Sequence, residues 1–159
     1  MADRRTPFTN GDERETLVAF LDYLRESVLG KVAGLDDAAL RRSLVPSGTS
    51  LLGLVKHLTM VEIVWFPFAF AGSDVRVPSD ELESADTTSS VIHSYRTVIT
   101  ASNEIVAGAT DLEQHCVRRA SAPELMSLRW VLVHMLEETG RHAGHADILR
   151  EQLDGQIGR

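Results

Sequence analysis

Apolar residues recur at steps of three and four along four long stretches of this sequence, the spacing that lines one face of an α-helix. No stretch shows the alternation of apolar and polar residues that is typical of a half-buried strand. Amphipathic helices must bury their apolar faces against one another, which predicts an all-α four-helix bundle with long crossover loops. The stretches run from about Asp12 to Val32, from Leu51 to Gly72, from Ser89 to Ala107 and from Ser127 to Leu153.

The second stretch is apolar on more than one side, so we expect it to be the most buried helix. Thr49 or Ser50 would cap its start. Pro67 would kink or end it, because proline lacks a backbone N–H. A short helix is predicted before it over Asp36–Arg42, with Asp36 as its cap.

Two polar loops and the last helix complete the predicted bundle. The loops are expected over Ser73–Thr88 and Gly108–Leu125. The last helix is expected to bury one apolar stripe against the rest of the bundle. The residues of that stripe are Leu128, Val131, Leu132, Met135, Leu136, Ile148 and Leu149.

Charge and composition bear on partners and location. The chain carries 16 basic and 23 acidic residues, a formal charge of −7, and such a surface repels nucleic-acid phosphates. No apolar run approaches the roughly 18 residues of a transmembrane helix, and the polar segment Met1–Pro7 lacks the apolar region of a signal peptide. We therefore expect a cytoplasmic protein that binds no membrane and forms one domain over residues 1–159. Cys116, the only cysteine, is expected to be an inert thiol.

Four candidate metal ligands lie within twelve residues of the last predicted helix: His134, Glu138, His142 and His145. Each helical residue advances about 100°, so the last three lie at about 40°, 80° and 20° from His134. All four side chains are therefore expected to point into one narrow sector of the helix. Two side chains four apart, such as Glu138 and His142, can bind one metal ion when a residue from elsewhere completes the site.

His57 is the natural third ligand. It lies in the most apolar helix, where an imidazole needs partners for its ring nitrogens, and a metal ion would satisfy one of them. A hydrogen-bonded core histidine is the alternative. The Glu138–His142 pair has an alternative too, as a solvated contact of the kind that Glu137 and Arg141 also suggest.

The roles of the other histidines are left open by the spacing. His134 is either a packing residue or a group that holds a ligand through a ring nitrogen. His145 is a fourth ligand, a supporting group or a substrate contact. His93, at the start of the third helix, and His115, in a polar loop, are both expected to be exposed.

Two segments carry a resemblance to a known family. They are Ser50-Leu-Leu-Gly-Leu-Val-Lys-His57-Leu-Thr-Met-Val-Glu62-Ile-Val-Trp65-Phe66 and the run from Ser127 to Glu151, which contains His134-Met-Leu-Glu-Glu138-Thr-Gly-Arg-His142-Ala-Gly-His145. The chain resembles the DinB-like (YfiT-like) metalloenzymes, and within them an actinobacterial subgroup related to mycothiol S-transferases. The resemblance covers nearly the whole chain.

The resemblance implies a four-helix bundle, often a homodimer, with a divalent metal held by His57, Glu138 and His142. The commonest family pattern has histidine where this chain has Glu138, although a related mycothiol-dependent isomerase uses histidine, glutamate and histidine. His145 stands where the family often has glutamine. The donor set suits zinc first, with nickel, iron and manganese as alternatives.

The function expected from this resemblance is a divalent-metal-dependent thiol S-transferase, with mycothiol as the thiol and a small electrophile as the second substrate. His145 and His134 would support catalysis by orienting the ligands or moving a proton. A metal-dependent hydrolase is one alternative. A non-catalytic metal-binding bundle is another. DNA repair gains no support from so acidic a chain.

Overall fold

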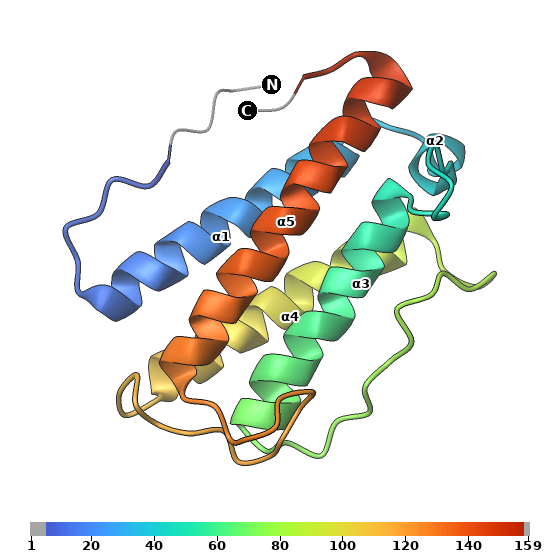
Figure 1. The fold of residues 1–159 in the computed structure, drawn as a ribbon. Helices are drawn as coiled ribbons and strands as arrows, with labels where there is room; N and C mark the ends of the chain where they lie inside the picture. The colour runs from blue at the N-terminus through green and yellow to red at the C-terminus, as the bar shows by residue number, and fades with distance from the viewer. Residues whose placement is uncertain (1–5, 158–159) are drawn as a thin grey trace.

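Four long helices pack side by side in the computed structural model, which describes residues 6–157 (Figure 1). The helix α5 lies between α1 and α3, and α4 lies behind it. No strand forms within these residues, so the predicted all-α bundle is confirmed. The elements are α1 (Glu13–Val32), α2 (Asp37–Arg41), α3 (Leu51–Ile63), η1 (Val64–Phe70), α4 (Thr88–Gly108) and α5 (Leu128–Asp154).

Side-chain caps set where the helices begin. Asp36 accepts a hydrogen bond from the backbone N–H of Ala39, and Ser50 accepts one from Gly53, so both predicted caps are confirmed. Thr87 and Ser90 form a reciprocal capping box, which starts α4 one residue before the predicted Ser89. A cap of this kind stabilises a helix by about 1 kcal/mol, because it satisfies a backbone donor that the helix leaves free.

Pro67 neither ends nor interrupts the second long helix. At Val64 the helix widens into the π-helical segment η1, which contains Pro67 and continues to Phe70. The wider turn accommodates the proline, whose missing N–H removes one ordinary helical bond. Gly72, at φ +65°, then turns the chain away from the helix.

The hydrophobic core agrees with most of the predicted stripe of α5 but not with Ile148. Leu128, Val131, Leu132, Met135 and Leu149 are buried, and Leu136 is half-buried. Ile148 is 56% exposed, so its prediction as a core residue is wrong. The buried positions near it are Ala143, Ala146 and Leu149, and Ile148 lies about 200° around the helix from Ala146.

A buried ion pair joins α1 to α3. The guanidinium of Arg25 donates to both carboxylate oxygens of Glu62 at 2.7 and 2.8 Å, and these side chains are only 1% and 0% exposed. Ser102 on α4 donates to the same carboxylate at 2.7 Å. Periodicity alone did not indicate this pair, because both residues occupy positions that a helical pattern assigns to the core.

Contrary to the expectation that no apolar run approaches the length of a transmembrane helix, Leu51–Phe70 passes as a membrane span by length and composition, with a mean hydropathy of 1.4. More than half of it is buried by the other helices, as the sequence predicted for the most apolar helix. The polar segment Met1–Pro7 falls mostly on residues 1–5, which lie outside the described residues.

Candidate metal centre

His57, Glu138 and His142 meet between α3 and α5. Nε2 of His57 lies 3.0 Å from Oε1 of Glu138, and Nε2 of His142 lies 3.0 Å from the same oxygen. The two imidazole rings are 4.8 Å apart between centroids. One ligand atom from each residue falls within 4.8 Å of the others, so the three predicted ligands are close enough to share one ion.

The spacing of these atoms fits a metal ion. Ligand atoms about 2.1 Å from a tetrahedral ion lie about 3.4 Å from one another. The two nitrogen-to-oxygen separations of 3.0 Å are close to that edge length. Three protein ligands leave one position of a tetrahedron open, the arrangement of a catalytic rather than a structural site.

Asp80 holds the other side of the His57 ring. Its Oδ2 lies 3.0 Å from Nδ1 of His57, so the imidazole lies between two carboxylates. A neutral imidazole carries one N–H and can donate to only one of them. If Nδ1 donates to Asp80, the lone pair of Nε2 faces the triad, the orientation that a metal ligand requires.

Glu138 is a buried carboxylate, 7% exposed. Burial raises its pKa, but hydrogen bonds with His57 and Arg141, and the charges of His142 and Arg141, outweigh burial and lower the pKa to about 2. Arg141 pairs with Oε2 of Glu138 and lies 3.5 Å from Glu137, the partner expected from the sequence. Glu138 is therefore ionised at neutral pH, the form that binds a metal.

His142 supplies a second indication of a ligand site. Its Nδ1 is buried and has no hydrogen-bond partner among the residues that the structure describes. Burial lowers its pKa, although the neighbouring Glu138 opposes this, so the imidazole favours its neutral, metal-binding form. An anionic carboxylate and two imidazoles are a donor set that suits zinc and other divalent ions of the first transition series.

The other two histidines of α5, His145 and His134, lie in different surroundings. His145 is exposed, and its ring contacts that of His142 at a centroid distance of 5.4 Å. His134 stacks on Trp130 at 5.0 Å and meets the edge of Trp65 at 4.8 Å. The four side chains expected to point into one sector of the helix therefore do not all meet. His134 contacts the two tryptophans, and it is not in the group of close ligand atoms.

Three residues to which the sequence assigned no role in the site are His93, His115 and Cys116. His93 and His115 are exposed, and Cys116 is buried. Burial raises the pKa of the Cys116 thiol, which keeps it protonated and agrees with the expected inert thiol.

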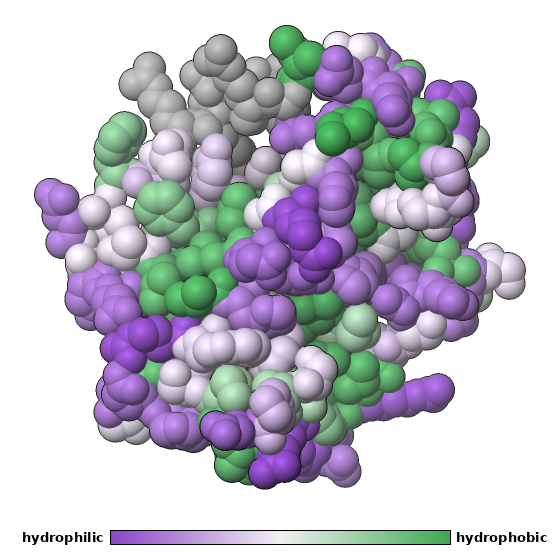
Figure 2. Space-filling model, in the orientation of Figure 1, coloured by the Kyte–Doolittle hydropathy of each residue, from purple (hydrophilic) through white to green (hydrophobic). Residues whose placement is uncertain are grey.

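A pocket of about 480 Å³ opens onto the triad. His57, His142 and Asp80 line it, together with the turn from Ser47 to Ser50 and part of the loop that follows η1. In Figure 2, hydrophilic residues gather over the middle of α5, with hydrophobic ones on either side. The pocket brings a small solute within reach of the candidate metal ligands.

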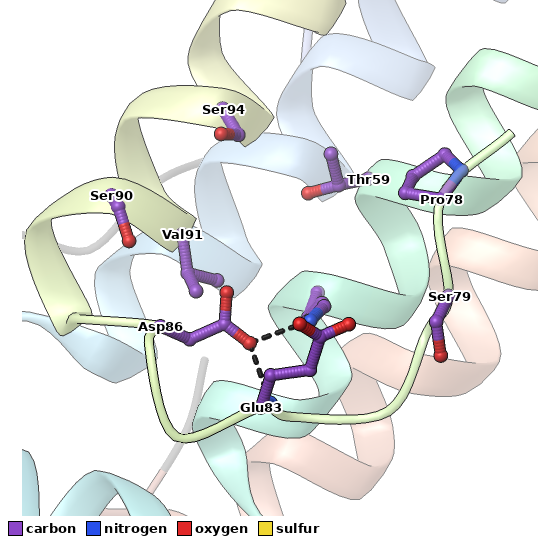
Figure 3. Close-up of a pocket in the computed structure, with 9 residues that line it drawn as sticks. Thr59, Pro78, Ser79, Glu83, Asp86, Ser90, Val91 and Ser94 are labelled. Atoms are coloured by element: carbon purple, nitrogen blue, oxygen red, sulfur yellow. Dashed lines mark hydrogen bonds and ion pairs between the residues drawn. The ribbon is translucent and has the colours of Figure 1, made fainter. Parts of the chain in front are cut away.

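A second pocket, of about 280 Å³, lies between α3, α4 and the loop that carries Asp80 (Figure 3). There Nζ of Lys56 lies 2.5 Å from Oδ2 of Asp86, and the backbone N–H of Glu83 donates to the same oxygen at 2.7 Å. These two hydrogen bonds, with that of Lys56 the stronger influence, lower the pKa of Asp86. Lys56 precedes His57 on α3, so the ion pair ties the Asp80 loop to the helix that carries this candidate ligand.

Sequence reasoning missed Asp80 as a partner of His57. Asp80 is one of five acids in an irregular loop, where no periodicity singles out one carboxylate. The only sequence signal was the general expectation that a ligating histidine donates its other nitrogen to an acceptor.

Comparison with known proteins places the fold and the family. Residues 16–155 match the family described as Mycothiol-S-transferase. No curated protein matches the sequence. A solved structure described as a conserved protein from Enterococcus faecalis aligns with a TM-score of 0.68 over 92% of this chain and 99% of its own, at 12% identity. At that identity the likeness shows a shared fold.

Proposed function

This chain belongs to the mycothiol-S-transferase family, and we propose that it transfers a small thiol of the mycothiol type to small electrophiles with the help of a divalent metal ion. The observation that carries the proposal is the convergence of His57, Glu138 and His142 at the end of an open pocket. Such a site binds a metal while leaving a position for a substrate atom.

The three residues would hold the ion, zinc first among the candidates. A bound divalent ion would supply Lewis acidity, which lowers the pKa of a thiol and favours the thiolate. Asp80, 3.0 Å from Nδ1 of His57, would orient that ring by accepting its N–H. Glu138 brings a negative charge that a third histidine would lack, and Arg141 keeps that carboxylate in place.

His145 is the residue we assign to proton movement. It is exposed on the same helix, and its ring meets that of His142 at 5.4 Å, so it borders the space where thiol and electrophile would react. An imidazole exchanges protons readily near neutral pH. His134 would act only by supporting the helix through its contacts with Trp65 and Trp130.

The proposal is tested by measuring metal content and conjugation of a bimane-type electrophile with mycothiol. The metal-loaded protein should accelerate conjugation, and a chelator should abolish the acceleration. His57→Ala and His142→Ala should each lose metal and activity, whereas His93→Ala, at an exposed site, should retain both. Equal rates with and without metal would refute the proposal.

The same assays separate the alternatives. Metal-dependent turnover of esters or amides without thiol would indicate a hydrolase. Stoichiometric metal with no turnover of either kind would indicate a non-catalytic bundle. We further propose a cytoplasmic homodimer that forms one domain over residues 1–159, with no nucleic-acid or membrane partner. Light scattering should then give twice the mass of one chain.

A further inference from the structure

A smaller pocket, of about 240 Å³, adjoins the pocket at the triad. Ser47 and Thr49 line both pockets, and their hydroxyls are 2.9 Å apart. His145 lines the smaller pocket and His142 the larger one, with the two rings in contact. The two pockets are therefore neighbouring compartments, separated by two hydroxyl side chains and one pair of imidazoles.

The polar residues of the smaller compartment lie on the side next to the triad pocket, and the rest of its lining is apolar. Its polar residues, Ser47, Thr49 and His145, are those that border the triad pocket or contact His142. The rest of its lining is aliphatic: Val45, Ile148 and Leu149. Most of its accessible lining is thus hydrocarbon, and no side chain of the lining other than His145 is ionisable.

Ile148 is the unusual member of this lining. It is 56% exposed, although the apolar pattern of α5 assigned it to the core. When an apolar solute covers a large aliphatic side chain that is open to solvent, the free energy of the system falls, which favours binding. Ile148 lies at the wall of a compartment next to the triad, where an apolar solute would cover it.

We propose that this compartment, which we call the aliphatic compartment, binds the electrophile: a small, uncharged, largely apolar molecule. The inference rests on the proposed thiol transfer and adds its substrate class. A volume below the roughly 300 Å³ of ordinary drug-sized pockets restricts the occupant to a small molecule. The larger compartment, whose lining includes the ionisable residues His57, Asp80, Glu81 and His142, then remains for the thiol.

The transfer step across the boundary balances without another reactant. The thiolate sulfur donates an electron pair to the electrophilic carbon and forms the S–C bond. The bond from that carbon to its leaving group breaks, and the group departs with the bonding pair as an anion such as chloride. The thiol proton, released before attack, passes to solvent through His145, which borders the compartment.

The kinetic test uses Ile148→Gln with two electrophiles and the same thiol. Chlorodinitrobenzene is uncharged, and iodoacetate is a small anion that gains nothing from aliphatic walls. We expect the KM for chlorodinitrobenzene to rise about fivefold, because the apolar surface that it covers is reduced. The KM values for iodoacetate and for the thiol should stay unchanged. Val133→Gln, at a site on α5 that is 51% exposed and outside both pockets, is the matched control.

A binding test separates this inference from the proposed function. The 1,3-isomer of dinitrobenzene has no activated leaving group, and no thiol is added, so it binds without reacting. Its addition to the protein should shift the NMR signals of Val45 and Ile148 but not that of Val133, and Ile148→Gln should weaken its affinity by a similar factor. Binding there without any thiol transfer would retain the compartment and refute the proposed function. Absence of these shifts, or an unchanged KM in Ile148→Gln, would overturn the inference.

Discussion

The Asp80 carboxylate lies 3.0 Å from Nδ1 of His57, on the opposite side of the ring from the nitrogen that faces Glu138. This contact links an irregular loop to a helix that contributes a candidate ligand. In the tautomer that carries its N–H on Nδ1, His57 donates to Asp80 and keeps the lone pair on Nε2, the form that a metal ligand requires. Asp80 is thus a positioning residue for the site.

Replacing Asp80 tests that role. Asp80→Asn should weaken metal affinity about 10- to 100-fold, because an amide accepts a weaker hydrogen bond and polarises the imidazole less. A competition titration with a chromophoric chelator would measure the change. Asp74→Asn, at an exposed position in the same loop, should leave affinity unaltered. A wild-type affinity for Asp80→Asn would show that the loop does not orient the ligand.

Replacing Glu138 by histidine tests how the negative charge of the carboxylate affects a thiol bound at the site. Glu138→His should retain a metal, because the donor set becomes the three-histidine pattern. The net charge of the site rises by one, so a bound thiol should ionise at lower pH. The acidic limb of the pH–rate profile is therefore expected to move to lower pH than in wild type loaded with the same ion. Movement in the opposite direction would contradict this account of the charge.

The low pKa of Glu138, about 2, predicts how the metal-free protein responds to acid. Because the folded-state pKa lies below the ordinary value of 4.5, ionisation of Glu138 stabilises the fold above pH 4.5. That contribution should disappear as the pH falls from 4.5 towards 2. Urea unfolding of chelator-treated protein should show the loss, and Glu138→Gln should show a shallower fall over the same range. Parallel pH curves for the two proteins would count against an ionised carboxylate.

The Arg25–Glu62 pair predicts a large effect on stability. Glu62→Ala leaves the Arg25 guanidinium buried without its bidentate partner, so the free energy of unfolding should fall by about 3–5 kcal/mol. Arg96→Ala removes an exposed contact with Glu26 at 3.8 Å and should cost less than about 1 kcal/mol. Thermal and urea unfolding would measure both. An equal loss in the free energy of unfolding for the two variants would mean that burial of the Arg25–Glu62 pair does not affect stability.

Much of the bundle could be predicted because each helix carries its own signals. The periodicity of the apolar residues gave the helices to within one or two residues. Asp36 was recognised as a cap from its residue type, and Ser50 was one of two candidates for the next cap. These features depend on residues a few positions apart. Pro67 was the local exception, since it does not end the helix and a widened turn accommodates it.

The prediction of Ile148 failed for a reason of geometry. A step of three or four residues keeps to one face only over short distances, because each residue advances about 100°. Along the 27 residues of α5, the face that packs on α1 and α3 is selected by those helices. His134 shows the same effect, since two tryptophans, one from η1 and one from α5, surround it.

The sequence by itself determined the helices, the all-α class and, through spacing and family resemblance, the residues that could bind a metal. Glu138 and His142 are one helical turn apart, so their proximity follows from the helix alone. Only the tertiary structure decided that His57 meets them at 3.0 Å, that Asp80 holds His57, and that Ile148 faces a pocket. Those contacts join residues 23 and 81 positions apart, and packing between helices and a loop, which no local pattern encodes, brings them together.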